Sequence, residues 1–102
     1  MGKKMKNKET EFRQWMENYR RLSESSIEKY SRVVNKISND LIKRGVIKLS
    51  ILDINEISEL ISLRKKYFSI KEYKDLNSRG NRMYSSGFNR LIDFLKFKHS
   101  QV

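Results

Sequence analysis

Four cations recur at helical spacing within the stretch 23–45: Lys29, Arg32, Lys36 and Lys43. Side chains three, four and seven residues apart share one face of an α-helix. By the same geometry these four fall within an arc of about 60°, centred some 140° from the apolar face of the stretch. Such a row can attract a polyanion. It is also typical of a solvated helix face, so the rest of the sequence must decide between the two.

A second group of cations lies beside a glycine. Arg79 and Arg82 are on either side of Gly80, at the expected start of a helix. The unpaired amides and the dipole of a helix N-terminus favour an anion, and neighbouring arginines would strengthen such a site. Gly80 would let a phosphate approach the backbone closely. Alternatively, Gly80 supplies a positive φ for the turn and the arginines point to water.

The overall charge favours binding to a polyanion. The 102 residues include 23 Lys and Arg against 12 Asp and Glu, which gives a net charge of +11. Nucleic acid is the first candidate, before an anionic membrane surface or an acidic protein. Arg32 and Asn35 are the candidate base readers if their helix enters a major groove. RNA is disfavoured because the aromatic residues follow apolar stripes, which leaves few to stack on single-stranded bases.

The sequence offers no catalytic or metal-binding constellation. His99 is the single histidine and cysteine is absent, which excludes a disulfide framework and a Cys-based zinc site. A Ser-His-Asp set would need a placed histidine, and one glycine at position 80 does not make a Walker-type phosphate loop. The carboxylates are scattered, mostly beside Lys or Arg. We therefore predict a non-enzyme that needs no cofactor and no metal ion.

Apolar periodicity predicts an all-α fold, a compact bundle of four to five helices in one domain. Proline is absent and only four glycines are present, which suits few of the tight turns of an all-β fold. A basic tail, 1–8, is expected to be disordered, followed by a single domain over 9–98. The expected helices cover 9–21, 23–45, 55–66, 70–76 and 81–98, with 46–52 as a buried connection.

Polar residues mark the expected helix ends. The predicted N-caps are Ser23 (or Ser25 with Glu28) for the long helix, Asp53 or Asn55 for the third, and Ser69, in a capping box with Glu72, for the fourth. Gly45 follows two cations and predicts the end of the long helix, because glycine adopts the left-handed C-terminal conformation at little cost. No apolar run approaches the length of a membrane span, and the N-terminus lacks a signal peptide.

The last helix carries two features with alternative explanations. Gly87 lies mid-helix, where it costs about 1 kcal/mol relative to alanine, and a close helix crossing would explain it. Phe94 and Phe97 lie off the main apolar stripe. Partial exposure of both would suit a protein-interaction or dimerisation module, the competing function, whereas a wide apolar face would place them in the core. Trp15, on the first stripe, is expected in the core.

Residues 12–44 resemble the N-terminal core-binding domain of tyrosine recombinases and phage integrases. The matching residues are Phe12 and Trp15 in the first helix, then Leu22-Ser23, Ser26-Ile27 and Tyr30. The family pattern is roughly L-S-x-x-T-I-x-x-Y, with Ser26 here in place of the usual threonine. The stretch 77–95, N-S-R-G-N-R-M-Y-S-S-G-F-N-R-L-I-D-F-L, is similar to N-terminal domains that precede nuclease domains in some bacterial HNH-type restriction endonucleases.

Both resemblances imply a small SAM-like helical bundle that grips duplex DNA for a separate catalytic domain. The recombinase Arg-His-Arg-Tyr set and the HNH histidines have no counterpart here. We therefore predict a non-catalytic, cytoplasmic, bacterial or phage-encoded domain that binds double-stranded DNA and no membrane. Its context would be DNA recombination, restriction or phage regulation, with a homo-oligomer or a catalytic protein as further partner. The predicted DNA-contacting residues are Lys29, Arg32, Asn35, Lys36, Lys43, Arg79, Gly80 and Arg82.

Overall fold

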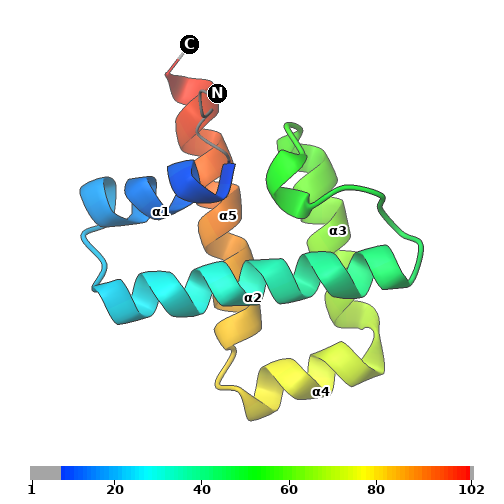
Figure 1. The fold of residues 1–102 in the computed structure, drawn as a ribbon. Helices are drawn as coiled ribbons and strands as arrows, with labels where there is room; N and C mark the ends of the chain where they lie inside the picture. The colour runs from blue at the N-terminus through cyan, green and yellow to red at the C-terminus, as the bar shows by residue number, and fades with distance from the viewer. Residues whose placement is uncertain (1–7, 102) are drawn as a thin grey trace, which may run out of the picture.

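The computed structural model describes residues 8–101, which form an all-helical bundle in which no β-strand occurs (Figure 1). In chain order the elements are α1 (Lys8–Tyr19), α2 (Glu24–Lys43), the 3₁₀ turn η1 (Ile51–Asp53), α3 (Ile57–Ser69), α4 (Lys71–Arg79) and α5 (Met83–Ser100). The predicted all-α bundle is confirmed. The expected tail, 1–8, lies outside the described residues except for Lys8, which begins α1.

The long helix α2 is the element on which the others are arranged. It runs across the front of the molecule, and α5 passes behind it, while α1 and α4 lie on opposite sides (Figure 1). The inner face of α2 follows the expected apolar stripe, and Val34, Ile37 and Leu41 are fully buried. Its most extensive packing is against α5, and it also packs on α1 and η1. One face of α2 is thereby core, and another is left open to solvent.

Both predicted ends of α2 are confirmed. The hydroxyl of Ser23 accepts a hydrogen bond from the amide of Ser26 at 3.2 Å, as an N-cap should. At the other end Gly45 has a φ of 76°, in the left-handed region. The amide of Val46 then donates to the carbonyl of Leu41 at 3.0 Å, which is the long hydrogen bond of a Schellman motif. The local sequence therefore fixes the length of this helix.

The mid-helix glycine of α5 marks the crossing with α2. A Cβ atom built on Gly87 would lie 2.8 Å from Cγ1 of Val33 and 3.6 Å from the ring of Tyr30. Side chains do not approach so closely, so only glycine permits the present separation of the two helices. The close crossing that would explain Gly87 is confirmed.

Of the two off-stripe aromatic residues of α5, Phe94 belongs to the core and Phe97 packs against its edge. Phe94 is only 5% exposed, and its ring lies 5.5 Å from Phe12 and 5.6 Å from Trp15, between centroids. Phe97 is half-buried, and the ring of Tyr19 of α1 lies tilted against it with centroids 4.6 Å apart. Because α1 packs across this part of α5, the apolar face is wide. The alternative of partial exposure is wrong for Phe94 and correct for Phe97, and Trp15 is in the core as expected.

The predicted capping box at the start of α4 is wrong. Ser69 is the last residue of α3, and its hydroxyl donates to the carbonyl of Lys66 at 2.7 Å. The corner between α3 and α4 is Ile70, whose backbone is extended and whose side chain packs against the core. Burial of this apolar side chain favours the later corner, so α3 continues past the predicted end. Glu72 lies in the first turn of α4 and is exposed.

The segment before α3 also departs from the predicted caps. Asp53 belongs to η1, which is capped by Ser50, and α3 starts after Glu56, which makes no side-chain capping bond. Asn55 instead uses its backbone carbonyl, which lies 2.9 Å from Nε2 of His99. The expected buried connection, 46–52, is correct only in part: Ile51 is fully buried, whereas Leu49 in the same segment is 66% exposed.

Candidate nucleic-acid interface

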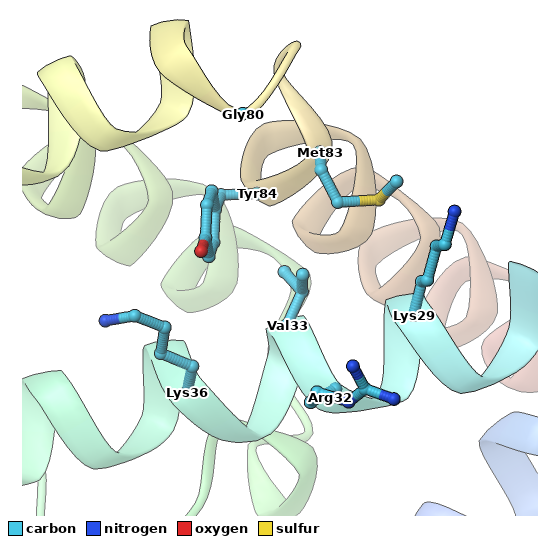
Figure 2. A pocket seen from close by; sticks show the side chains of 7 residues that line it. All are labelled: Lys29, Arg32, Val33, Lys36, Gly80, Met83 and Tyr84. Carbon is cyan, nitrogen blue, oxygen red and sulfur yellow. The ribbon is translucent and has the colours of Figure 1, made fainter.

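A hollow of about 240 Å³ lies between α2 and the turn that joins α4 to α5 (Figure 2). Its lining combines cations with apolar side chains: Lys29, Arg32, Val33, Lys36, Gly80, Met83 and Tyr84. The view shows Lys29 and Lys36 at its two ends, with Val33 between them. The two cation-bearing segments of the sequence, residues 29–36 and the turn at 80, therefore meet at one place.

The turn at the edge of the hollow is held by Asn77. Its side-chain oxygen accepts from the amide of Ser85 at 3.0 Å, and its side-chain nitrogen donates to the hydroxyl of Ser85 at 3.1 Å. Its carbonyl accepts from the amide of Arg82 at 2.7 Å. Asn81 and Arg82 have φ angles of 55° and 62°, which cost energy for residues with a Cβ atom. The bonds from Asn77 stabilise this tight conformation.

Gly80 lines the hollow, but it does not supply the positive φ that was one of its two expected roles. Its φ is −95°, so the alternative that it supplies a positive φ is wrong. A Cβ atom on Gly80 would lie 3.3 Å from the ring of Tyr84, so the glycine gives that ring room to pack against the turn. Two of the first three amides of α5 are also engaged, because Met83 donates to the carbonyl of Gly80 and Ser85 to the side chain of Asn77, each at 3.0 Å. An anion here would therefore be bound chiefly by side chains.

The charges along the open face of α2 are only partly neutralised. Lys29 is exposed and makes no ion pair or hydrogen bond with the residues that the structure describes. Arg32 is 72% exposed and lies 3.5 Å from Glu28. That carboxylate is closer to Arg13, at 3.0 Å, and its pKa is lowered chiefly by the hydrogen bond from Arg13. Glu28 is thus shared, and Arg32 keeps most of its surface for another anion.

Lys36 is held in place by a polar cluster that joins α2 to α3 and α4. Its ammonium donates to Oδ2 of Asp40 at 2.8 Å, and the hydroxyl of Tyr67 donates to the same oxygen at 2.7 Å. The ring of Tyr67 stacks on Tyr73 with centroids 4.3 Å apart, and Lys36 lies 5.8 Å from the Tyr73 ring. The Lys36 side chain nevertheless stays 41% exposed. The cluster therefore orients this cation without removing it from solvent.

This cluster predicts a stability loss at high pH. Burial, and then the hydrogen bond to Asp40, raise the pKa of Tyr67 above its ordinary value near 10. Above about pH 10 the folded state keeps the phenolic proton that the unfolded state releases. The contribution of Tyr67 to the free energy of unfolding is therefore complete below about pH 10 and is lost progressively above it. In the unchanged protein the free energy of unfolding should decline by up to about 1.4 kcal/mol per pH unit above pH 10 because of Tyr67, and Tyr67→Phe should remove this part of the decline. Urea unfolding from pH 8 to 11 measures it. Equal declines in both proteins would contradict the assignment.

The remaining predicted contact residues lie around the hollow at different distances. Lys43 is exposed on α2, seven residues or about 10 Å beyond Lys36. Arg79 ends α4 and Arg82 precedes α5, and both are exposed. Asn35 is turned away and lines a separate hollow with residues of α1 and η1. The structure therefore brings Lys29, Arg32 and Lys36 together at the hollow, whereas Lys43, Arg79 and Arg82 do not line it and Asn35 lies elsewhere.

Sequence reasoning missed the apolar side of the hollow and one cation. Tyr84 was expected on the buried stripe of α5, yet it is half-buried and lines the hollow. Periodicity alone cannot find it, because a half-exposed aromatic residue gives the same signal as a buried one. Arg90 of α5 lies 5.5 Å from the ring of Tyr30, the neighbour of Lys29, and so adds a charge at the α2–α5 crossing.

No protein-family model, curated protein or solved structure matches this chain. Within residues 8–101, no three His, Asp or Glu side chains form a group that could hold a metal ion. None of the helices described there combines the length and the apolar content that a membrane span requires. A functional assignment consequently rests on the cations of α2 and on the hollow beside them.

Proposed function

We propose that this chain is a non-catalytic domain that binds double-stranded DNA, mainly through its phosphates. The observation that carries the proposal is the hollow at which Lys29, Arg32 and Lys36 of α2 meet the turn at Gly80. Segments far apart in the sequence thus line one hollow, whose cations all come from α2. In a chain with a net charge of +11, this surface supports attraction to a polyanion at a defined place.

The dimensions of the basic surface suit a nucleic-acid backbone. From Lys29 to Lys43 the axis of α2 rises by about 21 Å. Duplex DNA carries one negative charge per roughly 1.7 Å of axis, so a helix of this length can meet several phosphates. Arg82, in the turn before α5, is a further exposed cation. Contacts of this kind position a protein on DNA and carry no sequence information directly, so we expect weak sequence preference.

We further propose that the domain serves as the DNA-gripping module of an integrase or restriction system, or as a small phage-type regulator. This context is supported by the resemblance of residues 12–44 to core-binding domains. Arg32 is the remaining candidate base reader, because its exposed guanidinium can reach beyond the backbone. A homo-oligomer or a separate catalytic protein would be the further partner.

Salt dependence tests the proposal. We expect the full chain to bind a duplex of arbitrary sequence, with log K falling linearly with log salt between 50 and 200 mM. Each neutralised phosphate contributes about −0.9 to that slope, so four or five contacts predict a slope near −4. Fluorescence anisotropy with two unrelated duplexes measures it, and both should give similar values. A slope shallower than −1, or no binding at 50 mM salt, would refute the proposal.

A further inference from the structure

We propose that the hollow seats one unpaired nucleotide, with its base against Tyr84 and Met83 and its phosphates on the cations of α2. This inference rests on the proposed DNA binding and adds a preference to it. A duplex that carries a bulged nucleotide should bind more tightly than a perfectly paired one. The argument uses the apolar lining, the charge of the rim and the rigidity of the walls.

The apolar lining suits a flat aromatic ring. Tyr84 and Met83 project from α5 towards α2, and Val33 points up between them (Figure 2). Aromatic rings stack on any nucleobase, and thioethers make favourable contacts with aromatic systems. The hydroxyl of Tyr84 forms no hydrogen bond with the described residues, and its ring, which packs against Gly80 on one side, stays half-exposed. A base could therefore stack on the exposed part of the Tyr84 ring and form a hydrogen bond with its hydroxyl.

The cations around the hollow favour a ligand that carries negative charge next to a flat aromatic ring. The lining includes the cations Lys29, Arg32 and Lys36 and no carboxylate. Lys43 continues the row of cations along α2, and Arg82 is an exposed cation of the turn between α4 and α5. A nucleotide within a DNA strand has this combination, because its base is flat and apolar on its faces and its backbone continues the charge on either side.

The walls of the hollow are formed before any ligand arrives. Gly80 allows the turn to lie close against the ring of Tyr84, where a Cβ atom would be 3.3 Å away. The hydrogen bonds of Asn77 fix the turn, and Asp40 holds Lys36 at 2.8 Å. Preorganised walls lower the entropy lost on binding, so the hollow does not need to be built at the moment of contact.

Base pairing decides which DNA can fill the hollow. In a perfect duplex the base must leave its stack and its partner, and this cost opposes insertion. A bulged base is already unpaired, so the stacking energy on Tyr84 appears as affinity. Stacking on one aromatic side chain corresponds to about tenfold or more in the dissociation constant. We therefore expect about tenfold tighter binding to the bulged duplex.

The experiment compares three otherwise identical 20-base-pair duplexes with the full chain. One is perfect, one carries a single bulged thymidine, and one carries a bulged abasic nucleotide. We expect the thymidine bulge to bind about tenfold more tightly than the perfect duplex, and the abasic bulge to resemble the perfect duplex. Tyr84→Leu should bring the ratio of the two affinities, thymidine bulge over perfect duplex, to about one. Tyr19→Leu, which removes an exposed tyrosine remote from the hollow, is the matched control and should keep it.

The outcomes separate this inference from the proposed function. Equal affinity of the unchanged protein for all three duplexes would overturn the inference while DNA binding stands. Failure to bind any of them would refute the proposed function itself. An abasic bulge that binds as tightly as the thymidine bulge would show that flexible DNA is preferred and that no base is seated. Met83→Ala provides a second variant if Tyr84→Leu does not fold by circular dichroism, and it should lower the ratio.

Discussion

Replacing Lys29, Arg32 and Lys36 together by glutamine should weaken binding to duplex DNA by about 10²–10³-fold at 0.1 M salt. Three lost phosphate contacts should make the salt slope shallower by about 2.7, because each contributes about 0.9. Glutamine is preferable to glutamate here, since a carboxylate at position 36 would repel Asp40, which lies 2.8 Å from the present ammonium. A glutamine amide can still donate to that carboxylate and keep the cluster satisfied.

A charge-matched variant distinguishes the surface of α2 from the charge of the whole chain. Lys48→Gln, Lys65→Gln and Lys96→Gln remove the same three charges at exposed positions that do not line the hollow. We expect this variant to change the slope by less than one unit. Anisotropy titrations from 50 to 200 mM salt measure both variants, and urea unfolding checks that each is folded. If the two triple variants lost the same affinity, net charge would be what drives binding, and α2 would not be the DNA-binding surface.

The cations of this surface could be predicted from the sequence because they depend only on local geometry. The apolar stripe and the two caps determine α2, and helical spacing then places Lys29, Arg32 and Lys36 on one face. The same geometry puts Asn35 about 60° beyond Arg32, on the flank that packs towards η1. Helical spacing alone does not show that α1 and η1 lie beside Asn35, and for this reason the sequence predicts it as a base reader.

The corners and the apolar side of the hollow could not be predicted, because tertiary packing decides them. Ser69 and Glu72 satisfy the local pattern of a capping box, yet burial of Ile70 places the corner one residue later. Tyr84 has the periodicity of a core residue, and its partial exposure depends on where α5 crosses α2. Phe94 was ambiguous for a similar reason, since only the path of α1 across α5 buries it. Single-sequence patterns carry no information about these crossings.

Gly87→Leu should lower the free energy of unfolding by about 3 kcal/mol, a large fraction of the 5–15 kcal/mol typical of a domain. Even a methyl group at this position would lie 2.8 Å from Cγ1 of Val33, and the β-branched Val33 has little freedom to rotate within a helix. Asn89→Leu, at an exposed position of the same helix, is the matched control, and we expect a change within about 0.5 kcal/mol. Urea unfolding of both variants measures the difference.

The same crossing connects stability to the DNA-binding surface, and a double-mutant cycle can show it. Gly87→Ala gains about 1 kcal/mol of helix propensity and loses about 1–3 kcal/mol to overpacking, so alone it should be mildly destabilising. Val33→Ala removes Cγ1, which would lie 2.8 Å from the new methyl group, and leaves Cβ of residue 33 at 3.3 Å. The free energy of unfolding of the double variant should therefore be higher than the sum of the two single effects predicts. Additive effects would mean that the helices separate freely. Coupling of 1 kcal/mol or more would mean that Gly87 sets the distance between α2 and α5, and with it the width of the hollow that Val33 lines.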